Sequence, residues 1–220
     1  PYHDFLDKEL QRIRDAWGAA RLISFGVSFA RQISPKPGKR RGTSPRPLRA
    51  RALPEPTPNE IKRRIEQIHQ PYHDFLDKEL QRIRDAWGAA LLIDLHSMPP
   101  LRRRSGEERA PRIVLGDRYG ASCDSVLADH AFRYLEHHGC QTAHNRPYSG
   151  GYVLDRHARP ARGIHGIQIE VCRTTYLDTA FSETTPNAKS LAQMLAGLVR
   201  VLGAETAGLA SGGQVAQAAE

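Results

Sequence analysis

The stretch that decides the fold reads Leu91-Leu92-Ile93-Asp94-Leu95-His96-Ser97-Met98-Pro99-Pro100. Its first half is a short apolar run shortly after a glycine, which is typical of a strand buried in a parallel sheet. The two prolines end the strand, because proline has no backbone N–H for a neighbouring strand. Ligands of open α/β sheets bind at the carboxyl ends of strands, so His96 stands where a site is expected. The alternative is an ordinary hydrogen-bonded histidine at a strand end.

Helical and strand patterns alternate on both sides of this stretch. Thr57 and Glu60 have the spacing of a capping box at the start of a helix. A second apolar helical stripe, restarted or kinked at Pro71, runs to Gly88 just before the strand. The remaining pattern predicts strands over 112–118, 140–144 and 163–173, and helices over 122–139 and 191–202. Helices joined to buried strands by short loops are the signature of an α/β fold.

The net charge of +8 belongs to one segment and not to a folded face. Residues 21–54 hold nine cations and no acid, which leaves a formal charge of −1 on the rest of the chain. Residues 34–58 also contain seven prolines, and such a segment buries too little apolar surface to offset its ordering entropy. A basic linker can touch nucleic acid weakly, but it lacks interleaved aromatic residues or a recognised binding module. Nucleic acid is therefore not a favoured partner.

A second unusual feature is an exact repeat, because residues 1–20 recur without a change at 71–90. Two identical copies with unrelated sequence between them do not fit a solenoid, and we interpret the first copy as a duplication, a gene-prediction error or a rearrangement.

The repeat and the composition together predict that the chain has four parts. They are a duplicated helical segment over 1–20, a basic Pro-rich linker over 21–56, an α/β domain over 57–205 and a disordered tail over 206–220.

Cysteine usage and hydropathy restrict the location of the protein. The three cysteines, Cys123, Cys140 and Cys172, are odd in number and widely spaced, which favours small buried hydrophobic residues in a reducing cytoplasm. No apolar run approaches the length that spans a bilayer. We therefore expect a cytoplasmic protein with no membrane partner.

The chemistry centres on His96 after one strand and Glu170 inside another. A carboxylate within a buried strand is costly unless a metal ion or a cation accompanies it. Amide hydrolysis needs an activated water, a group that moves its proton and a positive group for the oxyanion, and a zinc ion held by histidine supplies two of these. Glu170 can move the proton, and Arg173 can bind a carboxylate substrate. The alternative is a structural ion pair between Glu170 and Arg173.

The remaining histidines are interpreted as structural or as walls of the pocket. His137 and His138 stand at a helix end, where a cation suits the helix dipole. We expect His144 and His165 to be polar walls of the predicted pocket, and His157 to lie on the surface.

Four motifs occur in an order that resembles the N-formylglutamate amidohydrolase family, also called N-formylglutamate deformylases. They are residues 94–99 (DLHSMP), 113–118 (IVLGDR), 145–152 (NRPYSGGY) and 168–173 (QIEVCR), and the resemblance extends over about 53–202. The family hydrolyses N-formyl-L-glutamate to L-glutamate and formate at the end of histidine degradation. Its fold is similar to zinc-dependent exopeptidases, so the resemblance implies a three-layer α/β fold with a mixed sheet.

The resemblance also implies roles for individual residues. His96 would be a ligand of a divalent metal, zinc in the first instance, and Asp94 would orient its ring. Glu170 would be the catalytic carboxylate. The substrate, a small acidic N-acyl amino acid, would be bound by Asn145, Tyr148, Gly150, Gly151 and Arg173. Residues 170 and 173 face opposite sides of a regular strand, so Arg173 reaches the site only if the strand ends or bulges there.

The chain departs from the family at its N-terminal side. The family begins with strands and motifs that are expected to carry the other metal ligands, whereas residues 21–68 contain no histidine. A catalytic zinc commonly has three protein ligands, and the remaining ones are not found in this chain. The sequence therefore predicts a truncated member without the N-terminal strands, whose own activity is open. The alternative is a non-catalytic binding protein that keeps a pocket for an acidic ligand.

Overall fold

The described residues fall into two compact units, with 56–75 in the smaller one and 76–103 and 109–217 in the larger one. The computed structural model describes residues 56–103 and 109–217, with side chains up to residue 210. The predicted duplicated segment over 1–20 and all but one residue of the predicted linker lie outside these residues. No helix within the described ranges is long and apolar enough to cross a membrane.

The described part of the smaller unit is helical. Helix α2 (Pro58–Arg64) passes through a π-helical segment, η1 (Ile65–His69), into α3 (Gln70–Trp87). The Thr57 side chain accepts a hydrogen bond of 3.2 Å from the Glu60 N–H, which confirms the predicted N-cap. The interruption predicted at Pro71 takes the form of the wider π turn just before it, since proline lacks the N–H that continues an α-helix.

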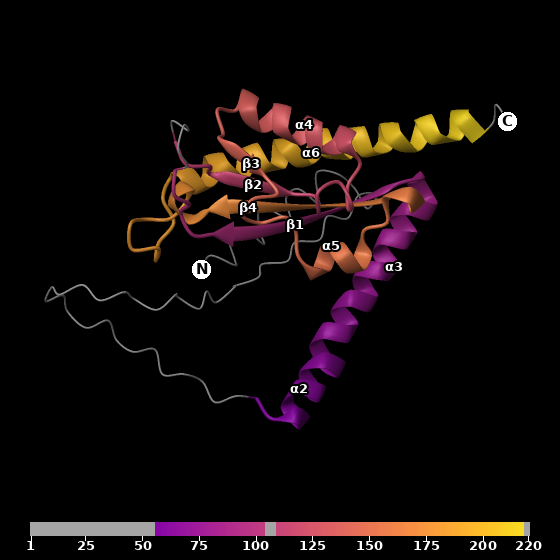
Figure 1. Cartoon of the computed structure of the whole chain (residues 1–220), viewed down its shortest axis with the longest axis horizontal. Helices are drawn as coiled ribbons and strands as arrows, with labels where there is room; N and C mark the ends of the chain where they lie inside the picture. Colours follow the sequence, from indigo (N-terminus) through magenta and orange to yellow (C-terminus); the bar gives the residue numbers. More distant parts are fainter. Residues whose placement is uncertain (1–55, 104–108, 218–220) are drawn as a thin grey trace, which may run out of the picture. The chain divides into compact units, whose positions relative to one another are not determined.

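A mixed sheet of four strands forms the centre of the larger unit, in the order β1-β4-β2-β3. The strands are β1 (Ala90–Met98), β2 (Ile113–Gly116), β3 (Thr142–His144) and β4 (Ile164–Cys172). β1 runs parallel to β4 and β2 runs parallel to β3, while β2 and β4 are antiparallel. The α/β class, the mixed sheet and the predicted parallel strand are therefore confirmed (Figure 1).

One face of the sheet is apolar and carries the main core. Helices α4 (Ser125–His137) and α6 (Asn187–Gln217) cover this face (Figure 1). The core joins alternate residues of the strands to leucines of the two helices, because strand residues two apart share a face. Its largest fully buried members are Ile93, Ile113, Leu115, Leu127, Leu135, Ile167, Ile169, Leu198 and Leu202.

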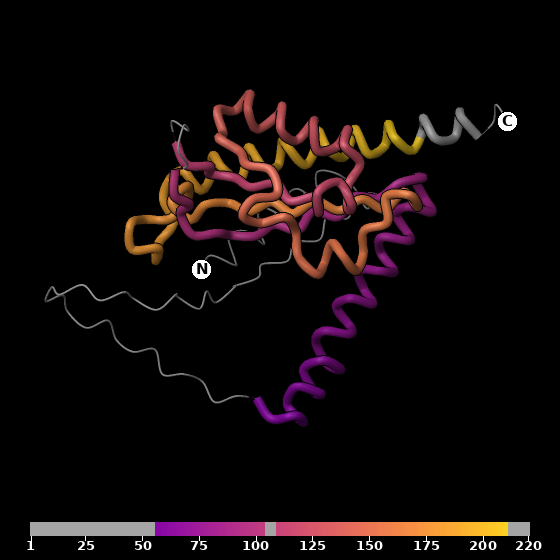
Figure 2. The backbone as a smooth tube through the Cα atoms, in the orientation of Figure 1, coloured from indigo at the N-terminus to yellow at the C-terminus, as the bar shows by residue number. Residues whose placement is uncertain are grey.

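The opposite face is apolar at one end and polar at the other. Leu76, Leu80 and Ile83 of α3 pack against Leu92 and Ile164 near the amino ends of β1 and β4. Helix α5 (Tyr152–His157) also contacts β4 on this side. Figure 2 follows the backbone from α3 through the turn into β1. Towards the carboxyl ends of the two strands, charged and amide side chains replace the apolar ones, so the fold leaves a polar area there.

Local sequence signals explain where several helices begin and end. Gly88 has φ of +80° and ends α3, as predicted, because glycine adopts this conformation without steric cost. The Asp124 side chain accepts a hydrogen bond of 2.9 Å from the Val126 N–H and caps α4. Helix α5, with Gly151 as its N-cap residue, was not predicted, since six residues carry too little periodicity to detect.

The predicted disordered tail over 206–220 is wrong for most of its length. Helix α6 continues to Gln217. Thr206 is buried and donates its hydroxyl to the Leu202 carbonyl at 2.7 Å, and Leu209 packs against the main core. The alanines of this segment favour a helix, and the core contacts supply the stability that composition alone does not reveal.

Candidate active site

Asp94, His96, Gln168 and Glu170 form the polar area at the carboxyl ends of β1 and β4. Asp94 pairs in register with Gln168 and His96 pairs with Glu170, so all four side chains share one face of the sheet. His96 Nε2 lies 2.9 Å from Asp94 Oδ2, and His96 Nδ1 lies 3.8 Å from Glu170 Oε1. The two side chains that the sequence predicted in one site therefore lie side by side, and their roles in a site stay a prediction.

Burial and charge shift the titration of both groups. Burial lowers the pKa of His96, but its hydrogen bond to Asp94 and the charges of Asp94 and Glu170 outweigh burial, so the pKa is raised from its ordinary value. Burial also raises the pKa of Glu170, against the opposing effects of His96 and of a hydrogen bond from Gln168. A carboxyl group whose pKa is moved towards neutrality is suited to accept and return a proton.

Gln168 connects Glu170 to the loop that precedes α5. Gln168 Nε2 donates to Glu170 Oε1 at 2.9 Å, and Gln168 Oε1 accepts from the Gly151 N–H at 2.9 Å. The amide therefore fixes one carboxylate oxygen and the start of α5 at once. Sequence reasoning missed this role, although the spacing of two residues on a strand already places Gln168 and Glu170 on one face.

Arg173 lies just beyond the end of β4. The sequence pattern requires the strand to end or bulge there if Arg173 is to reach the site. The strand ends at Cys172, and Arg173 begins the 3-10 helix η3 (Arg173–Thr175). Its Nε donates to Ser97 Oγ at 3.3 Å. The guanidinium also acts electrostatically on Glu170, whose pKa it lowers in part. Arg173 is thus placed at the same end of the sheet as His96 and Glu170.

The glycine loop lies directly over the sheet beside Gln168. Gly116 of β2 pairs with Gln168, and a Cβ at Gly116 would lie 2.6 Å from the backbone carbon of Ser149. Gly150 has φ of +109°, a conformation that favours glycine. The close approach predicted for this loop is therefore made to the protein's own sheet. It holds the Gly150-Gly151 backbone near the site.

Tyr148 completes the carboxyl-terminal edge of the polar area. It packs against the buried cluster of Met98, Val114 and Cys172. The pKa of Tyr148 is raised by burial first and by the charge of Glu170 second, while Arg173 opposes the shift. The phenol therefore lies within the electrostatic field of both groups, and stays a donor at neutral pH.

Asn145 is engaged in a separate polar cluster with Asp117. Its Oδ1 accepts from the Asp117 N–H at 3.0 Å, and its Nδ2 donates to Asp117 Oδ1 at 2.7 Å. His144 Nε2 lies 2.9 Å from Asp117 Oδ2. Burial opposes ionisation of Asp117, but these hydrogen bonds outweigh it and lower its pKa. The cluster supports the turn after β2, and a substrate role for Asn145 stays a prediction.

Two histidines lie elsewhere than expected. His165 Nδ1 accepts the Asp124 N–H at 3.3 Å at the start of α4. It stands at the amino end of β4, so it does not line the area around Glu170. His157 was predicted on the surface, but its side chain is fully buried and its Nδ1 lies 2.6 Å from Asp77 Oδ1. Both corrections depend on which helix covers the strand, which the local sequence does not indicate.

The described residues do not by themselves form a complete zinc site. Within 56–103 and 109–217, no group of three or more histidine, cysteine or acidic residues is arranged to hold a metal ion. Asp94 engages Nε2 of His96 and leaves Nδ1 towards Glu170. The His96 ring could therefore offer one nitrogen to a metal, which falls short of the three protein ligands of a catalytic zinc.

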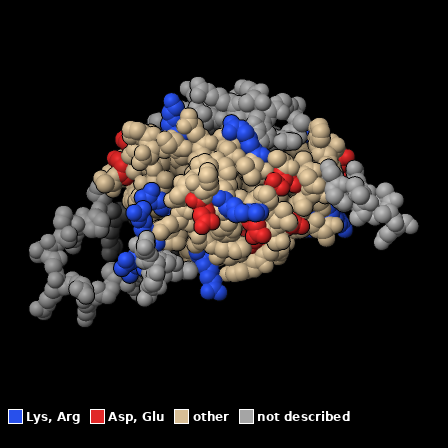
Figure 3. All heavy atoms as spheres, turned by 90° about the horizontal axis from the view of Figure 1, so that it is seen from above, with Lys and Arg blue, Asp and Glu red and all other residues tan. Residues whose placement is uncertain are grey.

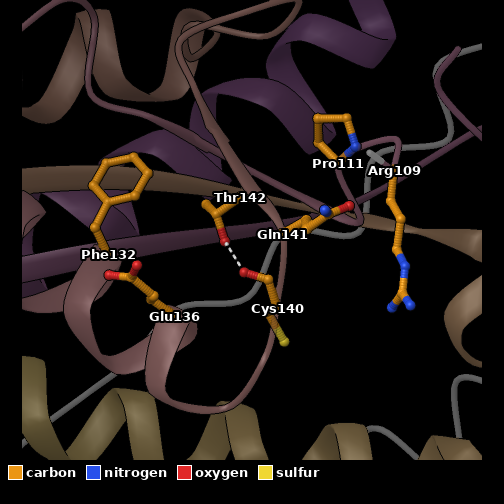
Figure 4. Close-up of a pocket in the computed structure, with 7 residues that line it drawn as sticks. All are labelled: Arg109, Pro111, Phe132, Glu136, Cys140, Gln141 and Thr142. Atoms are coloured by element: carbon orange, nitrogen blue, oxygen red, sulfur yellow. Dashed lines mark hydrogen bonds between the residues drawn. The ribbon is translucent and has the colours of Figure 1, made fainter. Parts of the chain in front are cut away.

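A cavity of about 520 Å³ lies away from the candidate site, beside the edge strand β3 (Figure 4). In it Thr142 Oγ1 donates to the Cys140 carbonyl at 3.3 Å. Burial raises the pKa of the Cys140 thiol, so it is protonated and unreactive near neutral pH. On the face shown in Figure 3, basic and acidic side chains of the described residues are interspersed.

A buried carboxylate opposite a histidine, at the carboxyl ends of adjacent strands in an α/β sheet, is suited to proton transfer. Sequence comparison identifies the class of enzyme to which the chain is related. The chain belongs to the N-formylglutamate amidohydrolase family, whose sequence profile matches residues 37–177. The match begins inside the segment predicted to be a linker. Homologues in this family are amidohydrolase enzymes.

Three relatives illustrate the similarity. The N-formylglutamate deformylase of Pseudomonas putida is 37% identical over 132 residues, which cover 60% of this chain and 48% of the relative. That of Pseudomonas aeruginosa is 31% identical over 124 residues, 56% of this chain and 47% of the relative. The crystal structure of N-formylglutamate amidohydrolase from Ralstonia eutropha JMP134 superposes with a TM-score of 0.58 at 30% identity, covering 70% of this chain and 54% of that one. The chain thus spans about half the length of these relatives.

Proposed function

We propose that this chain carries the proton-transfer and carboxylate-binding part of a site that hydrolyses N-formyl-L-glutamate to L-glutamate and formate. The observation that carries the proposal is the position of Glu170. It is buried, held by Gln168 at 2.9 Å and faces His96 at 3.8 Å. The deformylases named above are 37% and 31% identical to this chain over 132 and 124 residues.

The proposed chemistry uses Glu170 as the group that moves a proton. Glu170 accepts a proton from a water molecule as the water oxygen bonds to the formyl carbon. It then returns that proton to the amide nitrogen as the carbon–nitrogen bond breaks, which releases formate and the free amino group. The raised pKa of Glu170 suits both transfers. The raised pKa of His96 favours a positive charge beside the developing oxyanion.

Substrate binding is assigned to the arginine and the loop at the same end of the sheet. Among the described residues Arg173 forms no ion pair, and only its Nε is engaged, by Ser97. Its two terminal nitrogens are available for a carboxylate, which guanidinium groups bind in bidentate fashion. Tyr148 and the Gly150-Gly151 backbone would contact the rest of an acidic N-acyl amino acid.

A divalent metal, zinc in the first instance, remains part of the proposal. With a metal bound, His96 would be neutral and would contribute its Nδ1, since Asp94 holds its Nε2; the metal would then supply the positive charge beside the oxyanion in place of the imidazolium. Further ligands would have to come from outside the described residues. We also propose a cytoplasmic location, which the three free cysteines support.

The experiment is to measure formate release from N-formyl-L-glutamate by the purified chain and by Glu170→Gln, with the metal content of each preparation determined. We expect turnover by the parent chain and a loss of about 100-fold or more in Glu170→Gln, as for other acid–base residues. Glu136→Gln, an exposed change on α4, serves as the control and should keep full activity.

Two results would contradict this function. One is unchanged turnover in Glu170→Gln. The other is thermal stabilisation of the chain by N-formyl-L-glutamate with no formate released, which would favour the binding protein with an acidic-ligand pocket.

A further inference from the structure

A cavity of about 370 Å³ lies at the opposite end of β4 from Glu170. It is bounded by α3, α5, the 3-10 helix η2 (Pro160–Arg162) and the first residue of β4, Ile164. Glu170 lies six positions after Ile164 along the strand, roughly 20 Å at the rise of a β-strand. The cavity is therefore distinct from the candidate active site.

The lining of this cavity is strongly basic. Four arginines contribute to it, against one acidic residue, Asp77. The arginines are Arg84 from α3, Arg156 from α5, Arg159 between α5 and η2, and Arg162 from η2. Four guanidinium groups around one hollow repel one another unless anions offset them. Whether the cavity can bind an anion therefore depends on how far acidic groups of the protein offset the charges of these arginines.

Asp77 is the acidic residue of the lining, and it is already engaged. Its Oδ1 lies 2.6 Å from Nδ1 of the fully buried His157. The pKa of His157 is lowered, by burial first and in part by the charges of Arg156 and Arg159, against the opposing effect of Asp77. The imidazole therefore stays neutral near pH 7 and adds no positive charge to the cavity.

Asp85 and Asp155, which adjoin lining residues in the sequence, are paired with arginines other than Arg159 and Arg162. Arg84 Nε pairs with Asp85 at 2.6 Å, and Asp155 forms an ion pair with Arg118 in an adjoining cavity. Arg159 donates to the carbonyls of Asp155 and Ala158 at 3.0 and 2.5 Å. Within the part of the chain that the structure describes, neither Arg159 nor Arg162 forms an ion pair.

The backbone holds these arginines in place. Gly163 follows η2 with φ of +72°, and a Cβ there would lie 2.8 Å from the Gly88 carbonyl. Arg84 Nη1 also donates to the Arg162 carbonyl at 3.5 Å. The turn that carries Arg162 thus packs against the end of α3. Because the turn is already held in place, ligand binding does not carry the entropic cost of ordering it.

We propose that this cavity binds a small oxyanion with more than one negative charge, of the phosphate class. Guanidinium groups match phosphate oxygens in bidentate geometry and remain charged at any physiological pH. A volume of about 370 Å³ is within the range of small-ligand sites. The proposal does not rest on the hydrolase function, because none of its residues belongs to the candidate active site.

The test is a calorimetric titration of the purified chain with inorganic phosphate at constant ionic strength. We expect saturable binding of one phosphate per chain and a rise in melting temperature with phosphate concentration. The double variant Arg159→Gln/Arg162→Gln should weaken binding about tenfold or more. The control double variant, Arg133→Gln/Arg200→Gln, removes the same charge from exposed positions on α4 and α6 and should bind as the parent does.

Three results would overturn the proposal. Equal weakening in both double variants would show binding to net charge only. Titration without saturation would show that no site exists. Displacement of phosphate by glutamate at equal concentration would assign the cavity to carboxylates. If the double change destabilises the chain, the single variant Arg162→Gln takes its place. The Arg162 side chain is exposed, so this variant should fold, and it should weaken phosphate binding in the same direction.

Discussion

At the scale of single residues, the candidate site consists of one charged pair and its supports. Asp94 orients His96, and Gln168 orients Glu170. Both supporting residues stand two positions before the residue that they hold, on the same strand face. Residues of the strands themselves therefore fix the direction of the His96 ring and of the Glu170 carboxylate.

His165 should make stability depend on pH below neutrality. Burial lowers its pKa, against the opposing charge of Asp124, which is the acid that faces it at the start of α4. Its contribution to stability is therefore complete above the unfolded pKa of about 6.5. That contribution is lost as pH falls through the lower folded pKa, because the protonated ring cannot accept the Asp124 N–H.

Urea unfolding between pH 7.5 and 5.5 measures this effect. The free energy of unfolding should fall with decreasing pH, and the slope should be smaller in His165→Gln, whose side chain does not titrate. His157, whose pKa is also lowered, acts in the same direction, while His96 acts in the opposite one. The exposed change His137→Gln serves as the control. Identical slopes in the parent and in His165→Gln would refute the assignment.

At the scale of elements, the contact of the 149–151 loop with β2 decides where this loop lies relative to Gln168. The absence of a side chain at Gly116 lets the Ser149 and Gly150 backbone approach the sheet, and Gly151 then reaches Gln168. The loop and the strand are thus one structural unit. Any side chain at Gly116 would separate them.

Gly116→Ala should destabilise the protein by about 1–3 kcal/mol, the usual cost of overpacking. The added Cβ would lie 2.6 Å from the Ser149 backbone carbon and 2.7 Å from the Gly150 nitrogen, so backbone must move. The free energy of unfolding in urea measures the cost. Gly208→Ala is the matched control, since nothing lies within 4 Å of the added Cβ and alanine favours a helix by up to about 1 kcal/mol. A neutral Gly116→Ala would mean that the loop is not seated as described.

At the scale of the larger unit, stability comes from the face of the sheet opposite the site. The main core lies between the sheet and helices α4 and α6, whereas the polar area uses the other face. Separation of the two faces lets the protein keep buried charge at the site without interrupting its main core. Damage to the core should therefore act on stability first.

Leu127→Ala should lower the free energy of unfolding by about 2–5 kcal/mol, the range for a buried leucine truncated in a packed core. Leu127 is fully buried between α4 and the sheet. Its neighbour Val126 is 41% exposed, and Val126→Ala should cost only about 0.5 kcal/mol. Chemical denaturation of both variants provides the comparison. Equal losses would contradict the assignment of the core to this face.

Much of the fold could be predicted because its signals are local. Thr57 and Asp124 cap helices through their own neighbouring N–H groups, and Gly88 ends a helix through its own φ angle. The apolar run before His96 identified a buried strand. Helix α5 and the extension of α6 to Gln217 were missed, since short or Ala-rich helices are stabilised by contacts with distant residues.

The sequence by itself determined that the chain is an α/β protein of the N-formylglutamate amidohydrolase family, with His96 at a strand end and Glu170 within another strand. Only the tertiary structure decided which side chains meet. The register of β1 on β4 brings His96 to Glu170, the end of β4 places Arg173, and the packing of α3 on α5 buries His157 beside Asp77. The physical reason is that periodicity and capping act over a few residues, whereas pairing of charged side chains depends on strands and helices that are distant along the chain.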